Sequence, residues 1–92
     1  MIRSFRDRAS ERLWMGERMK RFSGIEKPVP RKLDMLHQAR DLQDLRAPPA
    51  NRLEALVGDR RGQHSIRIND QWRICFTWTK EGPANAEIVD YH

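Results

Sequence analysis

The sequence predicts an α+β fold, in which an antiparallel β-sheet carries two N-terminal helices on one face. Apolar residues recur at helical spacing in the first half of the chain, and they alternate with a period of two after Pro48 and Pro49. Short turn signals separate the later strands, so these strands can pair as a meander. Because 92 residues support one modest core, we expect residues 1–92 to form a single domain.

The first half of the chain predicts a short strand followed by two helices. Residues 2–5 alternate apolar with polar side chains and suggest an edge strand, and residues 8–21 follow a helical period in which Gly16 is a weak point. Prolines at positions 28 and 30 separate this helix from a second one, and Pro30 suits its first turn. The second helix carries an apolar stripe and is expected to end at Pro48 and Pro49.

The second half of the chain predicts the sheet. Strands are expected over residues 53–57, 63–69, 71–79 and 86–91, with turns at Asn69-Asp70 and Gly82-Pro83. In the strand over residues 71–79, apolar residues share one face, while Arg73, Cys75 and Thr77 share the other. The expected core combines residues of both halves, namely Leu33, Leu36, Leu42, Ile66, Ile68, Ile74, Phe76 and Ile88.

Positive charge is concentrated in two regions of the chain, whose formal net charge is +5. Residues 1–32 contain ten Lys and Arg against four Asp and Glu, and residues 52–80 contain six against three. Two such regions suit a polyanion, because each neutralised phosphate releases a condensed counterion. Charge alone does not separate this interpretation from an ordinary solvated surface.

Composition also argues against several classes of protein. The ordered apolar periodicity is not typical of a disordered chain, and no apolar run reaches the length of a membrane span. The first twelve residues carry four arginines without an apolar stretch, which argues against a secretory signal. Cys75 is the only cysteine, so neither a disulfide within the chain nor a cysteine-based zinc cluster is expected. We therefore expect a cytoplasmic protein that uses no metal, no cofactor and no membrane.

Residues able to transfer protons lie at the end of the sequence. Asp90, Tyr91 and His92 follow the apolar part of the last predicted strand, and Arg73 lies in the strand before it. To cut RNA without a metal, the 2′-hydroxyl must lose a proton and attack the adjacent phosphate, while the leaving oxygen gains a proton. His and Tyr can move these protons, a carboxylate can orient the His, and Arg can bind phosphate oxygens. From chemistry alone, a polar chain end beside an exposed arginine explains the same residues.

Several motifs together resemble one protein family. They are the opening Met1-Ile2-Arg3-Ser4-Phe5, the Gly58-Asp59-Arg60 turn, the Asn69-Asp70-Gln71-Trp72-Arg73 turn and strand, and the closing Asp90-Tyr91-His92. Together with the rest of residues 56–76, they resemble the HigB branch of the RelE/ParE toxins. The resemblance covers nearly the whole chain, although residues 6–45 match only loosely.

The resemblance implies a compact RelE-like domain that acts as the toxin of a type II toxin-antitoxin system. Such a toxin is a ribosome-dependent mRNA endonuclease that inhibits translation. Its implied partners are the ribosome, mRNA and a HigA-type helix-turn-helix antitoxin, and it would meet operator DNA only through the antitoxin complex. By matching position, Arg73 would stabilise the scissile phosphate and His92 would act as acid or base. Asp90 and Tyr91 would complete the site.

Other positions are expected to contact RNA or to support the fold. Arg60, Arg61 and Arg67 are candidate contacts of ribosomal or messenger phosphates. The chain departs at Glu54 and Val57 from the family member compared most closely with it, which has a His and a Lys at these positions. Valine cannot bind phosphate, and Glu54 would repel the RNA backbone or act as a different base. His37, His64, Trp72 and Cys75 are expected to be structural, with base stacking as an alternative for Trp72.

Two other functions remain open at this point. The ParE branch shares the fold and inhibits gyrase without cutting RNA, although the Asp90-Tyr91-His92 end and Arg73 argue against that assignment. A non-catalytic partner that regulates transcription together with its antitoxin would explain the missing lysine at Val57.

Overall fold

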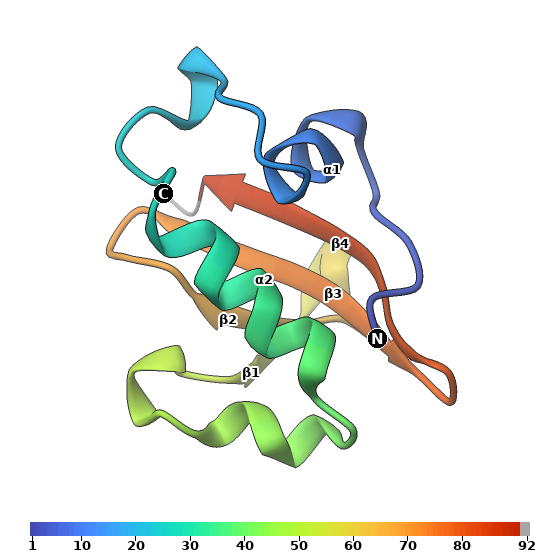
Figure 1. Cartoon of the computed structure of the whole chain (residues 1–92). Helices are drawn as coiled ribbons and strands as arrows, with labels where there is room; N and C mark the ends of the chain where they lie inside the picture. Colours follow the sequence, from blue (N-terminus) through green and yellow to red (C-terminus); the bar gives the residue numbers. More distant parts are fainter. Residues whose placement is uncertain (91–92) are drawn as a thin grey trace.

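Four antiparallel strands form one sheet in the order β1-β2-β3-β4. The computed structural model describes residues 1–90, and Figure 1 shows the sheet with helix α2 lying across it. The strands are β1 (Glu54–Ala55), β2 (His64–Arg67), β3 (Trp72–Thr79) and β4 (Gly82–Asp90). The predicted meander is therefore confirmed, and so is the α+β class.

Two helices precede the sheet, and each begins at a residue suited to that place. In α1 (Arg8–Trp14), the carboxylate of Asp7 accepts a hydrogen bond from the backbone N–H of Ser10, which satisfies one unpaired donor of the first turn. The chain leaves α1 just before Gly16, whose φ of 94° favours glycine. In α2 (Pro28–Gln38), Pro28 occupies the first turn, where its missing N–H costs no helical hydrogen bond.

The core lies between the helices and one face of the sheet. Ile66, Ile74 and Ile88 are paired across β2, β3 and β4, and all three are almost fully buried. Leu33 and Leu36 of α2 and Leu13 of α1 belong to the same cluster. Within the expected core, Leu42 and Ile68 are only partly buried, while the unpredicted members include Phe22, Ile25, Val29 and Leu45.

The expected length of the second helix is wrong, because α2 ends at Gln38. The next residue, Ala39, is extended, and a 3-10 turn, η2 (Leu42–Arg46), follows. Asp41 and Asp44 form a capping box at the start of η2: Asp41 accepts from the amide of Gln43, and Asp44 accepts from the amide of Asp41. These local hydrogen bonds compete with continued α-helix, so the chain turns before it reaches the prolines.

Two further expectations about turns and strands need correction. The β3–β4 turn consists of Lys80 and Glu81, whereas Gly82 and Pro83 already belong to β4. The predicted strand over residues 53–57 is reduced to β1, because the following residues leave the sheet for a 3-10 turn, η4 (Gly58–Arg60). Two shorter 3-10 turns, η1 (Lys20–Phe22) and η3 (Pro49–Asn51), complete the described elements.

The N-terminal segment pairs with β4 in parallel, rather than forming a full strand. Phe5 makes an isolated bridge to Ala86, and the amide of Arg3 donates to the carbonyl of Pro83 over 2.8 Å. This pairing covers part of the β4 edge. The edge strand predicted over residues 2–5 therefore lies where it was expected, but only an isolated bridge at Phe5 forms. None of the helices in residues 1–90 has the length and apolarity needed to cross a membrane.

Candidate functional site

The face of the sheet that points away from the helices carries the candidate site. Side chains alternate between faces along a strand, and partners across neighbouring strands share a face. Arg73 on β3 is paired with Arg67 on β2, and Glu54 on β1 is paired with Ser65 on β2. Because Ile74 and Ile66 point into the core, these four polar residues lie on the opposite face.

Arg73 is the central residue of this face. Its guanidinium lies 3.2 Å from a carboxylate oxygen of Glu54 and 3.5 Å from the hydroxyl oxygen of Ser65. The Arg73 side chain is 14% exposed, whereas that of Glu54 is 48% exposed. Glu54 and Ser65 of the neighbouring strands therefore orient the guanidinium, which remains partly exposed to solvent, as a phosphate-binding arginine must be.

The carboxylate of Asp90 does not lie beside Arg73. Asp90 is paired with Trp72, and Val89 is the residue opposite Arg73, so alternation places the Asp90 side chain toward the face of Trp72. There, Asp90 accepts a hydrogen bond from the side-chain amide of Gln71 over 3.1 Å. Tyr91 and His92, the other two candidates at the end of the sequence, lie outside the described residues.

The three candidate RNA contacts have different surroundings. Arg60 lies in η4, and its guanidinium is 3.1 Å from both the Glu87 carboxylate and the side-chain oxygen of Gln63. Arg67 forms an ion pair with Asp70 in the β2–β3 turn. Arg61 directly follows η4 and is exposed. Of the three, Arg61 is thus the most accessible to a ligand, whereas Arg60 already forms part of a network within the protein.

Cys75 is completely buried, although it points away from the helical face. Burial raises the pKa of its thiol, with the nearby charges of Arg60, Glu87 and Arg73 as smaller influences of mixed sign. Something other than the helices must therefore cover the sheet at this point. The segment around η4 provides that cover, since Arg60 reaches over β3 to Glu87 on β4.

The residues expected to be structural have that role. His37 accepts a hydrogen bond from the backbone N–H of Ile2 over 3.2 Å, and its ring lies 5.6 Å from that of Trp14. The His64 ring stacks on Phe76. Trp72 is 8% exposed and meets Phe22 edge-on, so it belongs to the core rather than to a base-stacking surface.

Sequence reasoning missed two residues of the site. Ser65 is fully buried and supports Arg73, and Glu87 joins Arg60 to Arg6. A partial signal existed for Ser65, because it lies two residues before Arg67 and therefore shares the Arg67 face. No signal existed for Glu87, since its role depends on the register between β3 and β4.

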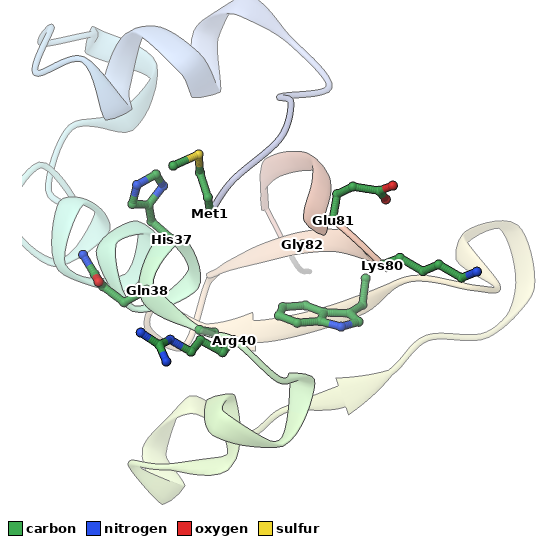
Figure 2. Close-up of a pocket in the computed structure, with 9 residues that line it drawn as sticks. Met1, His37, Gln38, Arg40, Lys80, Glu81 and Gly82 are labelled. Atoms are coloured by element: carbon green, nitrogen blue, oxygen red, sulfur yellow. The ribbon is translucent and has the colours of Figure 1, made fainter.

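A pocket of about 390 Å³ lies away from this site, on the helical side of the sheet. It is lined by the end of α2, by the β3–β4 turn, by Trp78 and by Met1 (Figure 2). Trp78 alternates with Phe76 and packs against the core, so the pocket and Arg73 are on opposite faces. Within residues 1–90, no three His, Cys, Asp or Glu side chains come together as a metal site would require.

Comparison with known proteins places the chain in a family. Residues 3–92 match the family of RelE-like toxins of the type II toxin-antitoxin system HigB. Toxin HigB-1 of Vibrio cholerae is 38% identical over 94 aligned positions, which cover 100% of this chain and 98% of that protein. An uncharacterised protein of Haemophilus influenzae is 41% identical over 70 positions, which cover 76% of this chain and 68% of that protein.

The fold also matches a solved structure. A chain of the YoeB-YefM complex from Staphylococcus aureus aligns with a TM-score of 0.58 over 100% of this chain and 98% of that chain. At 20% identity this similarity supports the fold alone. The family match over nearly the whole length carries the assignment: the chain belongs to the HigB family of RelE-like toxins from type II toxin-antitoxin systems.

Proposed function

We propose that this toxin is a metal-independent endoribonuclease that cuts mRNA on the ribosome and thereby inhibits translation. The observation that carries the proposal is the contact of Arg73 with Glu54 on the open face of the sheet, at 3.2 Å. It places a fixed cation and a carboxylate side by side, which are the groups needed to stabilise the pentacoordinate transition state at phosphorus and to accept a proton. Membership of a family whose members are generally endoribonucleases supports the same conclusion.

In the proposed reaction, the 2′-oxygen of the mRNA forms a bond to the adjacent phosphorus, and the bond from phosphorus to the 5′-oxygen breaks. A base takes the 2′-hydroxyl proton, and an acid gives a proton to the leaving 5′-oxygen. Arg73 donates hydrogen bonds to the phosphate oxygens as negative charge develops on them. The products are a 2′,3′-cyclic phosphate and a 5′-hydroxyl end.

Two residues are candidates for the base. Glu54 is half exposed and directly contacts Arg73, so a 2′-hydroxyl bound near Arg73 would be within its reach. His92 is the candidate that the family resemblance supplies, with Tyr91 and Asp90 completing the site. If Glu54 is the base, His92 is left to serve as the acid. The orientation of Asp90 toward Gln71 makes a direct role beside Arg73 harder to support than the roles of the other three.

The proposed partners follow from the family and from the charge. The basic regions at residues 1–32 and 52–80 would bind ribosomal RNA, and Arg61 and Arg67 of the second region would be among the phosphate contacts. A HigA-type helix-turn-helix antitoxin would neutralise the toxin, and operator DNA would be bound only through that complex. The toxin would therefore work in the cytoplasm, where translating ribosomes are found.

Cleavage of mRNA bound in the A site of purified ribosomes tests the proposal. We expect the wild-type chain to cut at a single-turnover rate that falls at least a hundred-fold in Arg73→Ala, because the transition state loses its main electrostatic contact. Removal of residues 91–92 should abolish cleavage with little change in thermal stability. A 5′-phosphate on the downstream product would contradict the proposed mechanism, since 2′-oxygen attack leaves a 5′-hydroxyl.

Two controls address the alternative functions. The same RNA without ribosomes should remain intact, and purified gyrase should retain its supercoiling activity in the presence of the toxin. Expression in cells should arrest growth, and Arg73→Ala should relieve the arrest. Growth arrest that persists in Arg73→Ala would favour a binding function over cleavage.

A further inference from the structure

The loop over residues 57–63, here called the η4 loop, is closed at its base and tied at its tip. At the base, the amide of Leu56 donates to the carbonyl of Gln63 over 2.9 Å. At the tip, the guanidinium of Arg60 lies 3.1 Å from Glu87 on β4. The loop connects β1 and β2, and β3 lies between β2 and β4, so the contact with Glu87 joins the loop to a strand that is not its neighbour in the sheet. In Figure 1 the loop lies behind the strands, on the side away from α2.

Glu87 is the meeting point of two segments that are distant in sequence. Besides Arg60, the Arg6 guanidinium of the N-terminal segment lies 3.7 Å from the same carboxylate oxygen. The Glu87 side chain is only 20% exposed and that of Arg60 is 30% exposed, so water screens their pair less than it screens a surface ion pair. Beneath the pair lies Cys75, the partner of Glu87 on β3, which is completely buried.

The η4 loop also borders the Arg73 site. Glu54, which contacts Arg73, lies three residues before Val57, where the loop begins. Ser65, which supports Arg73, lies two residues beyond Gln63, where the loop ends. The η4 loop is therefore continuous with both strands that present groups to Arg73.

We propose that Glu87 is a positioning residue, which holds the η4 loop over the sheet through Arg60 and so keeps Glu54 and Ser65 in place beside Arg73. Arg60 then acts through Glu87 and does not bind RNA phosphate itself. This inference rests on the proposed nuclease function, and it deepens that function by giving Arg60 and Glu87 one shared role. Displacement of catalytic groups by about 1 Å costs up to about a hundred-fold in rate.

A double-mutant cycle on the full chain tests the inference. Glu87→Gln and Arg60→Gln should each lower the single-turnover rate of cleavage at saturating ribosome by about ten- to a hundred-fold. The double variant should be no slower than Glu87→Gln alone, because Arg60 acts only through Glu87, whereas Glu87 also contacts Arg6. The salt dependence of ribosome binding should not change in Arg60→Gln, since no phosphate contact is lost.

A direct phosphate contact by Arg60 predicts a different pattern. Glu87→Gln would then release Arg60 for RNA and leave the rate unchanged or raise it, while Arg60→Gln would reduce the salt slope by about one released counterion. Either result would overturn the inference, as would additive losses in the cycle. Glu81→Gln is the matched control, because it removes an exposed carboxylate from the β3–β4 turn, away from the site, and should keep the wild-type rate.

Hydrogen exchange separates failure of the inference from failure of the proposed function. In Glu87→Gln, the amides of residues 58–63 should exchange faster, while those of Ile74 and Ile88 in the core should not change. Unchanged exchange in the η4 loop would overturn the tether. If the wild-type chain does not cut ribosome-bound mRNA, the nuclease proposal fails, and this measurement still decides whether Glu87 holds the loop.

Discussion

Replacing Val57 with lysine should raise the rate at which this toxin cleaves RNA under the proposed function. Val57 is 84% exposed and lies at the start of the η4 loop. By the resemblance described above, it takes the position where a member of the family has a lysine. Because the side chain makes little contact with the protein, Val57→Lys should change the free energy of unfolding by less than about 0.5 kcal/mol. A change in rate would therefore reflect the new charge and not a change in the fold.

The size of the effect depends on how far bound RNA excludes water. An ammonium about 4 Å from a phosphate oxygen gains about 1 kcal/mol in bulk water, which corresponds to a rate increase of about five-fold. In a site covered by RNA, one transition-state contact typically contributes about 3 kcal/mol, or about a hundred-fold. We expect the single-turnover cleavage rate at saturating ribosome to rise within this range in Val57→Lys, and growth inhibition to deepen.

The control is Val57→Ala, which shortens the same exposed side chain and adds no charge. It should leave both the rate and the growth inhibition at wild-type levels. An unchanged rate in Val57→Lys would refute the reasoning, because it would mean that position 57 does not face the scissile phosphate. Another cation, such as Arg67, would then have to contact the scissile phosphate beside Arg73.

The other predictions concern stability and accessibility. Asn51→Ala should lower the free energy of unfolding, measured in urea, by about 2 kcal/mol. The reason is that buried Asn51 donates hydrogen bonds to the carbonyls of Leu45 and Ala47 and accepts one from Lys32. An unchanged urea midpoint would contradict this. Gly82→Ala should lower the melting temperature, since its φ is 123° and a Cβ there would lie 2.6 Å from the carbonyl oxygen of Met1; Gly24→Ala, with an open Cβ position, should cost less. The buried thiol of Cys75, whose pKa is raised, should resist alkylation at pH 8 until urea unfolds the chain. Rapid labelling of the folded protein would argue against burial. Because the thiol ionises at a lower pH in the unfolded chain than in the folded one, the contribution of Cys75 to the free energy of unfolding should decline as the pH rises above about 8.5.

The sequence predicts the sheet better than it predicts the connections. Apolar residues alternate along β3, so the core face of that strand follows from the sequence alone, whereas the complete burial of Cys75 on the other face does not. The end of α2 does not follow, because a helical apolar stripe continues past Gln38 and the capping box of Asp41 and Asp44 ends the helix first. Local side-chain hydrogen bonds of this kind compete with a pattern and leave little trace in its period.

The candidate site likewise has residues that the sequence predicts and residues that depend on how the strands pair. Arg73 could be chosen from the sequence because its residue type, its strand and the family motif agree. Its neighbours Ser65 and Glu54 depend on the register of three strands, which the sequence constrains only through the apolar face. The place of Asp90 shows the limit most clearly, because a shift of one residue in the pairing of β4 decides on which face it lies.

The contacts between the first ten residues and the last strand have a consequence for synthesis. The hydroxyl of Ser4 accepts from the amide of Asn85, and the hydroxyl of Ser10 accepts from the amide of Ile88, over sequence separations of 81 and 78 residues. A chain made from its N-terminus cannot close these contacts until β4 has left the exit tunnel. The N-terminal segment therefore reaches its final place only after β4 has been synthesised, so the first ten residues wait for the last described strand before their hydrogen bonds can form.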